Sequence, residues 1–356
     1  TIIAGMADYP AAVVHSSFDP ATMASGSVGT GPFVLESHEV GVKSVSVKNE
    51  GFDWWGYSAG RTCPLDRIEY IDYGTDPAAW LAAAEADEVD CFYENVGEYV
   101  DIMEGIGWEN SEIATGSTIL IRPNQTSPDA DGNTVYADKR VRQALAMAVD
   151  NNICLELGYA NKGQAADNHH AGPMHPEHDA SVGRLPFDPA KAKALMAEAG
   201  MADYEHELIS IDDDWRKNTT DAVAAQLRDA GIKVKRTILP GSTFWNDWAK
   251  YPFSSTNWNH RPFATQVWGL AYRSGEAWNE MGWSNAEFDA LLAEANAIAD
   301  ADKRRAVAGK CQALIAEEGC TIQPYWRSLY RSHSSNTVCD MHIAYHAHVY
   351  KWGFKA

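Results

Sequence analysis

The segment 257–262 places an arginine beside tryptophan, asparagine and histidine side chains. The Arg261 guanidinium offers a planar fork of hydrogen-bond donors that suits a carboxylate or a phosphate. Aromatic rings close by in the sequence offer flat faces to sugar rings, apolar side chains or cationic groups. Because a polar anchor between aromatic walls is typical of small-molecule sites, the pattern predicts a solute site made of Trp258, Asn259, His260, Arg261, Trp268, Tyr272 and Trp278. The competing interpretation places most of the thirteen tryptophans in the core and Arg261 in an ion pair between two lobes of the protein.

A second group of residues with possible chemistry is the segment 168–178, which contains four histidines. Imidazoles are good ligands for nickel, copper and zinc, so the segment could serve a metal or metallophore carrier or a metal-dependent hydrolase. Pro173 and Pro176 predict a loop rather than a helix with ligands spaced along one face. We favour solvent-exposed loop histidines that hold no metal, and we keep the metal functions as the alternative.

Three more histidines, His342, His346 and His348, occur at alternating positions near the end of the chain. Such alternation predicts that they share one face of a β-strand. These imidazoles could chelate an ion, but we favour a solvated sheet face. The six cysteines include no C-x-x-C pair, which argues against zinc-ribbon and thioredoxin-like sites and leaves disulfides outside the cytoplasm open.

The sequence lacks the motifs of the common hydrolases and nucleotide-binding enzymes. The glycine-rich segment 26–31 has no Lys-Ser/Thr of a P-loop and precedes a predicted strand rather than a helix. Neither G-x-S-x-G nor H-E-x-x-H occurs, and the acidic run 212–214 fits the start of a helix, where the helix dipole stabilises negative charge. We therefore predict a protein that is not an enzyme and has no cofactor.

The composition is typical of a globular protein with an acidic surface, with 45% hydrophobic residues, 22% charged residues and a formal net charge of -20. No basic stripe is present to neutralise phosphates, which argues against nucleic-acid binding.

A chain of 356 residues exceeds the length at which a single core stops growing, so two packed units are expected. No apolar run reaches membrane-spanning length. Thr1 is not an initiator methionine and no signal-peptide pattern follows it, which indicates a processed or truncated start.

The elements that must position these residues alternate between strands and helices. Four strands are predicted in the first hundred residues, at 33–36, 42–47, 68–73 and 89–93. Asp138 and Asp188 each open a helix, and Gly200 closes the second one. The order strand, helix, strand over 205–239 is typical of a βαβ unit with parallel strands. Two amphipathic helices follow, at 285–299 and 302–318, and they precede a strand-rich tail that needs a sheet to join.

Seven short segments keep the order found in the family 5 extracellular solute-binding proteins, the peptide, nickel and opine-type binding components of bacterial ABC importers. The segment GTGPFVLE at 29–36 resembles the first of these, and DKRVRQA at 138–144 resembles the most recognisable segment of the family. The other five lie at 48–55, 65–68, 76–79, 88–90 and 187–200. The chain is similar to this family over essentially its whole length.

The resemblance implies an α/β, two-lobed periplasmic-binding-protein fold of type II, cluster C, with the N-terminal subdomain of the family missing here. Lobe I would comprise residues 1–122 and lobe II residues 123–323, while 324–356 would return to lobe I. Hinge crossings would lie near 119–124 and 323–326. The resemblance also implies a ligand held in the cleft between the lobes, no catalysis, a periplasmic location, and a monomer that delivers a small-molecule solute to the membrane permease of an ABC transporter.

Residues 258–262 resemble a Trp-Gly-x-Arg-Pro segment found in one branch of the family. Peptide-binding relatives usually carry an aspartate in this loop that pairs with a free amine, and none of residues 254–265 is acidic. The expected ligand is therefore a small polar solute, namely an oligopeptide, an opine or a sugar-phosphate-like molecule. The missing aspartate slightly favours anionic or glycosylated solutes over free peptides.

Overall fold

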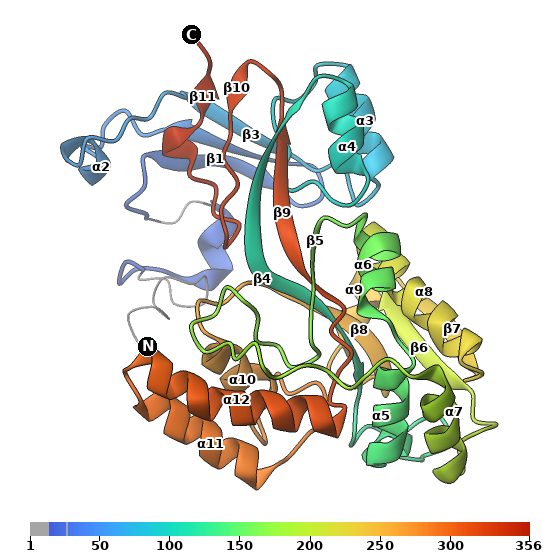
Figure 1. Ribbon diagram of the computed structural model, residues 1–356. Coiled ribbons are helices and arrows are strands. Elements are labelled where there is room, and N and C mark those ends of the chain that lie inside the picture. The colour runs from blue at the N-terminus through green and yellow to red at the C-terminus, as the bar shows by residue number, and fades with distance from the viewer. Residues whose placement is uncertain (1–13, 26–27) are drawn as a thin grey trace. The chain divides into compact units, whose positions relative to one another are not determined.

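The computed structural model of the protein describes residues 14–25 and 28–356. Thr1 and the first two residues of the glycine-rich segment 26–31 lie outside the described residues. The chain divides into two compact units, a continuous unit (Ala114–Ser328) and a split unit formed by the segments on either side of it. The chain passes between them within strands β4 (Glu109–Pro123) and β9 (Tyr325–His333), as Figure 1 shows. The predicted lobe boundaries at 122/123 and 323/324 lie inside β4 and just before β9.

The continuous unit is built on a six-stranded sheet with the strand order β5-β9-β4-β8-β6-β7. Its remaining strands are β5 (Gly163–Ala165), β6 (His206–Ile211), β7 (Val234–Leu239) and β8 (Phe253–Trp258). Strands β6 and β7 are parallel and are joined by α8 (Asp214–Asp229), which confirms the predicted βαβ unit. Strand β8 is antiparallel to β4, with Trp258 opposite Thr118, so the predicted solute loop leaves the sheet from an inner strand.

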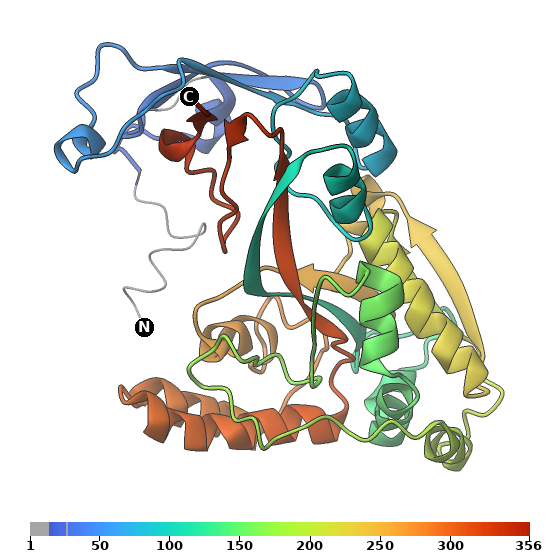
Figure 2. The same ribbon diagram turned by 45° about the horizontal axis from the view of Figure 1, so that its top comes forward.

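Helices cover both faces of this sheet (Figures 1 and 2). One face carries α8 together with α5 (Lys139–Met147), α6 (Asn151–Tyr159) and α7 (Pro189–Glu198). The other carries α10 (Ala264–Ala271), α11 (Ala286–Ala297) and α12 (Ala301–Glu318). Because side chains alternate across a strand, Ile121 enters the core beneath α5 to α8 while Leu120 enters the core beneath α10 to α12. The short elements η3 (Val135–Ala137) and α9 (Gly241–Phe244) complete the unit.

Local capping signals set the helix ends, as the sequence predicts for Asp138 and Asp188. A side-chain oxygen accepts a first-turn backbone N–H bond at five of these helices, and the capping residues are Asp138, Asp150, Asp188, Asn285 and Asp300. Gly319 ends α12 with a φ of 63°, in the left-handed region. An added Cβ there would lie 2.9 Å from a backbone atom of Arg142, so this position requires glycine. Among the described residues, no helix combines the length and the apolar character needed to cross a membrane.

The split unit contains an antiparallel sheet of β1 (Phe33–Glu39), β2 (Lys43–Lys48) and β3 (Arg67–Ile71), which confirms three of the four strands predicted there. The strand predicted over 89–93 is wrong, because Cys91 forms an isolated bridge with His333 and its neighbours are irregular. Helices α3 (Pro77–Glu85) and α4 (Tyr99–Gly105) enclose a small core in which the rings of Phe92 and Trp108 stack with their centroids 5.1 Å apart. Its shorter elements are η2 (Pro20–Ser25), α2 (Trp55–Ser58), β10 (Thr337–Val338), η4 (Val349–Lys351) and β11 (Gly353–Phe354).

The strand predicted over 342–348 is wrong. All of this stretch is described, and it forms a turn and irregular backbone with no ladder bonds to a sheet. Tyr345 has a φ of 60°, outside the β region, and its N–H donates to the carbonyl of His342 across the turn at 2.9 Å. The chain therefore bends at the point where an alternating pattern predicted an extended strand.

Candidate solute-binding loop

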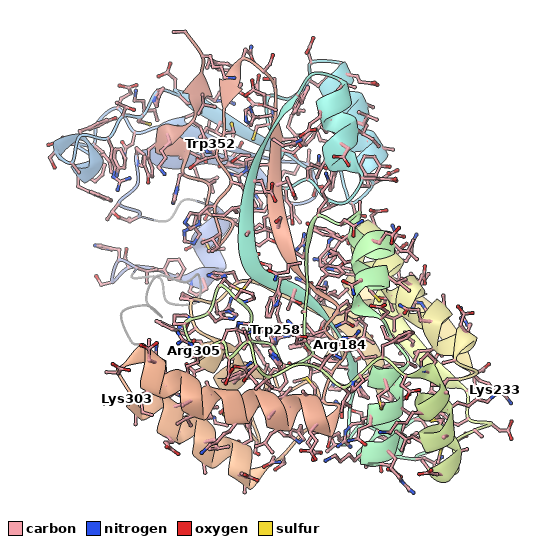
Figure 3. The ribbon with its side chains drawn as sticks, viewed as in Figure 1. Arg184, Lys233, Trp258, Lys303, Arg305 and Trp352 are labelled. Carbon is pink, nitrogen blue, oxygen red and sulfur yellow. The ribbon has the colours of Figure 1, made fainter. Side chains whose placement is uncertain are left out.

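The predicted loop begins where β8 ends at Trp258, which Figure 3 labels, and finishes where α10 begins at Ala264. Two hydrogen bonds hold it against β4. The backbone N–H of Gly116 donates to Nδ1 of His260 at 2.9 Å, and the backbone N–H of His260 donates to the hydroxyl of Ser117 at 3.0 Å. A Cβ on Gly116 would lie 2.9 Å from that ring nitrogen, so the approach of β4 to the loop depends on a glycine. The loop therefore has a fixed position relative to the sheet.

The histidine-rich segment packs against the same loop. Nε2–H of His175 donates to the carbonyl of Arg261 at 3.1 Å, while Nδ1 of His175 accepts the backbone N–H of Gly172 at 2.9 Å. The rings of His175 and His260 lie nearly parallel with centroids 6.2 Å apart. Burial, followed by the effect of His260, lowers the pKa of His175 from 6.5 to about 3, so this imidazole is neutral at physiological pH.

The expectation of solvent-exposed histidines in 168–178 is wrong for three of the four. His169, His170 and His175 are buried, at 0%, 0% and 3% exposure. His169 uses its ring nitrogens within the protein, with Nε2 near the carbonyl of Val182 at 3.1 Å and Nδ1 near the backbone N–H of Ala171 at 3.4 Å. These imidazoles exchange water for protein hydrogen-bond partners, which a loop can do only when distant segments cover it.

His170 occupies an aromatic enclosure behind the loop. Three aromatic rings surround it with centroids 5.8 to 5.9 Å away, those of Trp258, Tyr272 and Trp326. Its Nδ1 is 3.3 Å from the hydroxyl of Tyr272, and its Nε2 is buried without a hydrogen-bond partner. Burial lowers the pKa of His170 well below 6.5, so it too is neutral.

The structure brings the predicted site residues together, but at different depths. Trp268 and Tyr272 are fully enclosed in the core formed with α11 and α12. Trp258 and Arg261 are buried at 6% and 4% exposure, and one Arg261 nitrogen donates to the carbonyl of His260 at 3.1 Å. Trp278 exposes 39% of its surface and packs edge-on against Trp258 with ring centroids 5.9 Å apart. His260 is buried and Asn259 half-buried, so Trp278 presents the largest exposed aromatic face of the set.

A buried ion pair that the sequence analysis missed orients Trp258. Glu280 and Arg122 form an ion pair with both side chains 0% exposed. Oε1 of Glu280 accepts the indole N–H of Trp258 at 2.7 Å, and the hydroxyl of Thr256 donates to Oε2 at 2.7 Å. The available signal was an acidic residue within the aromatic stretch 277–283.

A second buried pair ties the histidine-rich segment to the helices. Arg304 of α12 donates to Glu177 at 2.7 Å, with side-chain exposures of 7% and 0%. The other oxygen of Glu177 accepts the backbone N–H of Ala264 at 3.1 Å, at the start of α10. The loop, the histidine-rich segment and the helix following the loop therefore form one hydrogen-bonded assembly.

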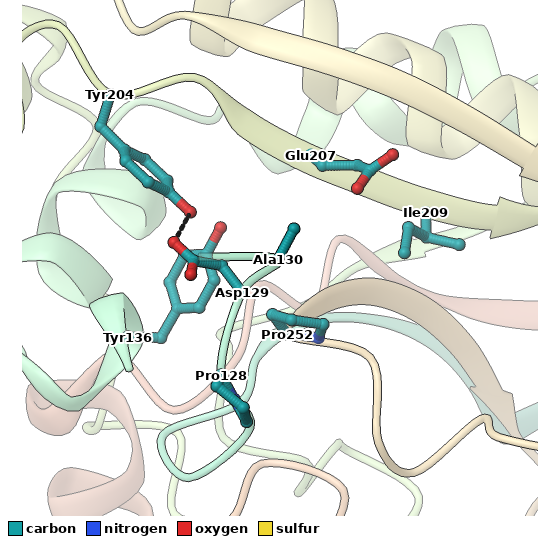
Figure 4. Close-up of a pocket in the computed structure, with 8 residues that line it drawn as sticks. All are labelled: Pro128, Asp129, Ala130, Tyr136, Tyr204, Glu207, Ile209 and Pro252. Carbon is teal, nitrogen blue, oxygen red and sulfur yellow. Dashed lines mark hydrogen bonds between the residues drawn. The ribbon is translucent and has the colours of Figure 1, made fainter. Parts of the chain in front are cut away.

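The continuous unit also contains a pocket of about 230 Å³ elsewhere on its sheet (Figure 4), lined by Pro128, Asp129, Ala130, Tyr136, Tyr204, Glu207, Ile209 and Pro252. The hydroxyl of Tyr204 donates to Asp129 across it at 2.9 Å. None of the predicted solute-binding residues lines this pocket. Its volume is below the roughly 300–1,000 Å³ of most small-molecule sites.

Two histidine clusters among the described residues have the composition of a metal site. The first is Asp167, His169 and His178 in the continuous unit, and the second is His342, His346 and His348 in the split unit. In each, the potential ligand atoms lie within 4.8 Å of one another. The first cluster is weakened as a metal site because His169 already uses both ring nitrogens.

Comparison with known proteins identifies the family. The model of the bacterial extracellular solute-binding proteins, family 5 Middle, matches residues 1–279. The chain belongs to this family. Its members and the similar solved structures are binding proteins rather than enzymes.

Two curated family 5 relatives cover most of the chain. Heme-binding protein A of Haemophilus influenzae is 26% identical over 326 residues, which are 83% of this chain and 54% of that protein. Oligopeptide-binding protein AppA of Bacillus subtilis is 26% identical over 332 residues, or 84% of this chain and 55% of that one. The chain thus spans about half the length of these relatives.

Solved structures confirm the predicted α/β periplasmic-binding-protein fold. The periplasmic binding protein DppA from Helicobacter pylori, in complex with the peptide STSA, matches with a TM-score of 0.83 at 16% identity over 100% of this chain and 70% of that chain. NikA from Staphylococcus aureus, in complex with Ni(L-His)2, matches with a TM-score of 0.81 at 16% identity over 97% of this chain and 73% of that one.

Proposed function

We propose that this protein is the substrate-binding component of an ABC importer, a monomer outside the cytoplasm that captures a small polar solute and delivers it to the membrane permease. The observation that carries the proposal is the family 5 match over residues 1–279. The periplasm is the proposed location. The buried, cross-linked support of the loop 258–261 agrees with a site that must hold its shape before the solute arrives.

The proposed solute is an oligopeptide, an opine or a sugar-phosphate-like molecule. The relatives are named for heme and oligopeptide binding, and the similar structures hold a peptide and a nickel–histidine complex. In this chain the exposed face of Trp278 suits a ring or an apolar side chain, and the positive charge of Arg261 suits a carboxylate or a phosphate. Trp258, Asn259 and His260 complete the proposed contact surface. Trp268 and Tyr272 support it from the core.

A ligand screen by thermal unfolding tests this function on the natural full-length protein. A solute that binds the folded state raises the unfolding temperature, with about 2.7 kcal/mol of added stability at a concentration one hundred times Kd. Peptides, opines, sugar phosphates and heme form the panel. The proposal predicts stabilisation by at least one of these classes with saturable dependence on concentration, and a flat response to all of them contradicts it.

Two tryptophan variants locate the bound solute. We expect Trp278→Ala to weaken binding of the stabilising solute by at least about tenfold, or about 1.4 kcal/mol, because the exposed ring face is lost. Trp245→Ala is the matched control, since Trp245 is 44% exposed in the same unit and outside the loop. Isothermal titration calorimetry measures both. Equal affinities for the two variants would place the solute elsewhere.

A further inference from the structure

The tail of the split unit gathers three histidines that are separate in the sequence. After β10 the chain turns at Tyr345, and the N–H of Tyr345 donates to the carbonyl of His342. This turn brings His342 and His346 face to face, with ring centroids 4.8 Å apart and planes 10° from parallel. His348, at the cap of η4, completes the group with its ring 4.5 Å from that of His342 and 6.2 Å from that of His346.

The ring nitrogens of this histidine triad are available to a ligand. One potential ligand nitrogen from each ring lies within 4.8 Å of the others. Nδ1 of His348 is buried and has no hydrogen-bond partner. Nδ1 of His342 accepts the backbone N–H of Ala344 at 3.2 Å, which leaves Nε2 of this ring for a ligand. Because a buried polar atom without a partner is costly, the Nδ1 of His348 indicates a missing partner at this position.

A metal ion can reach the triad from solvent. Neutral imidazoles carry the lone pairs that transition metals bind. All three side chains are half-buried, so an ion can reach them from solvent.

The charged groups around the triad are of both signs. Asp340 favours a cation here, and its two oxygens accept from the indole of Trp352 at 3.1 Å and from Lys351 at 3.4 Å. Lys351 and Arg61 oppose a cation, and Arg61 lies over the ring of Tyr350 at 4.7 Å. Trp352 lies in the same tail (Figure 3). Both oxygens of the Asp340 carboxylate already have partners and the two cations cannot bind a metal ion, so the imidazoles are the ligand set. Nitrogen ligands favour a transition metal over Ca²⁺ or Mg²⁺.

We propose that His342, His346 and His348 bind a divalent first-row transition metal ion, with Zn²⁺, Ni²⁺ and Cu²⁺ as the candidates. Three imidazoles leave at least one coordination position for water or a small ligand. The ion crosslinks the turn at Tyr345 to η4 and thereby stabilises a tail that has only short strands of its own. The site is independent of solute capture by the loop at 258–261.

Metal titration of the tag-free protein tests the site. We expect about one equivalent of Zn²⁺ to bind with micromolar or tighter Kd by isothermal titration calorimetry, as three imidazoles allow. Co²⁺ used as a probe should give visible absorption bands characteristic of nitrogen ligands. Binding of well under half an equivalent at micromolar protein concentration would overturn the proposal.

Variants assign the bound metal to these histidines. His346→Asn and His348→Ala should each weaken Zn²⁺ binding by at least about tenfold, because each removes one of three ligands. His38→Ala is the matched control, since His38 lies on β1 of the same unit and its Nδ1 lies 2.6 Å from the hydroxyl of Ser44. His178→Ala tests the cluster in the continuous unit.

A check of folding separates the loss of a metal ligand from a general loss of structure in these variants. The metal-free unfolding temperature and circular dichroism of each variant are compared with those of the unmodified protein, and only variants that match it are titrated. Full Zn²⁺ affinity in both folded triad variants, or loss of binding in His178→Ala alone, would refute the site. Added Zn²⁺ should raise the unfolding temperature of the unmodified protein and of His38→Ala, but not that of His346→Asn.

Discussion

Glu280 is a fully buried carboxylate that pairs with Arg122 and accepts hydrogen bonds from Thr256 and Trp258. Such a group contributes less through the strength of its ion pair than through the cost of leaving its partner charge buried and unpaired. Its connection to Trp258 means that a substitution in the second half of the aromatic stretch changes the orientation of a ring at the end of β8.

We expect Glu280→Gln to lower the free energy of unfolding by about 3–5 kcal/mol, because the glutamine keeps an acceptor for Trp258 but leaves Arg122 as an uncompensated buried charge. Urea denaturation followed by tryptophan fluorescence measures this loss. Glu276→Gln is the control, since Glu276 pairs with Arg273 at side-chain exposures of 32% and 54%. That exposed pair should contribute less than about 1 kcal/mol. Equal losses in the two variants would show that Glu280 does not compensate Arg122.

Helix α6 approaches α8 closely at Gly158. A Cβ on Gly158 would lie 2.3 Å from the hydroxyl of Thr219 and 2.7 Å from its Cα. That hydroxyl is already committed, because it donates to the carbonyl of Trp215 at 2.7 Å and lies 2.5 Å from the hydroxyl of Tyr325. Glycine at 158 therefore sets the distance between the two helices, and through Thr219 it sets the fit of α8 against β9.

Gly158→Ala should destabilise the protein by about 1–3 kcal/mol, because the added methyl group overpacks a helix contact that includes backbone. Gly269→Ala in α10 is the matched change, since nothing lies within 4 Å of its ideal Cβ and its φ is not positive. There the better helix propensity of alanine should add about 0.5–1 kcal/mol. Thermal and urea unfolding of the pair give the comparison, and a Gly158→Ala variant as stable as Gly269→Ala would show that the helices can move apart freely.

Acid stability is a property of the continuous unit as a whole, because unfolding of the unit exposes its buried histidines together. Burial lowers the pKa values of His169 and His206 from 6.5 to about 4, and that of His175 to about 3. The folded-state pKa values are depressed, so the stabilisation from the neutral rings is complete above the unfolded pKa near 6.5. It is lost as pH falls from about 6.5 towards 4, since the unfolded state then binds more protons.

We expect the free energy of unfolding to fall as pH is lowered from 7 to 5, with each buried histidine contributing up to about 1.4 kcal/mol per pH unit below its unfolded pKa. Urea midpoints at pH 7, 6 and 5 measure the slope. His206→Phe should reduce that slope, because burial alone lowers the pKa of His206. A midpoint that is the same at pH 7 and pH 5 would contradict neutral buried histidines.

The sequence by itself determined the features that depend on neighbouring residues. The caps Asp138 and Asp188 set helix starts through bonds within one turn, and the strand–helix–strand order over 205–239 set a parallel pair. The ordered family segments likewise pointed to the family that the comparison then identified. These signals are local or keep their order along the chain, so they can be recognised without tertiary contacts.

Only the tertiary structure decided which polar residues are buried and which come together. His170 and Tyr272 lie 102 positions apart and meet inside one aromatic enclosure. His342 and His346 come together through a single turn at Tyr345, whose backbone lies in the left-handed region. The alternating histidines suggested a strand because side-chain alternation does not reveal a φ of 60° at Tyr345. Burial and clustering depend on which distant segments cover a residue. The type of a residue and its neighbours in the sequence do not reveal those tertiary contacts.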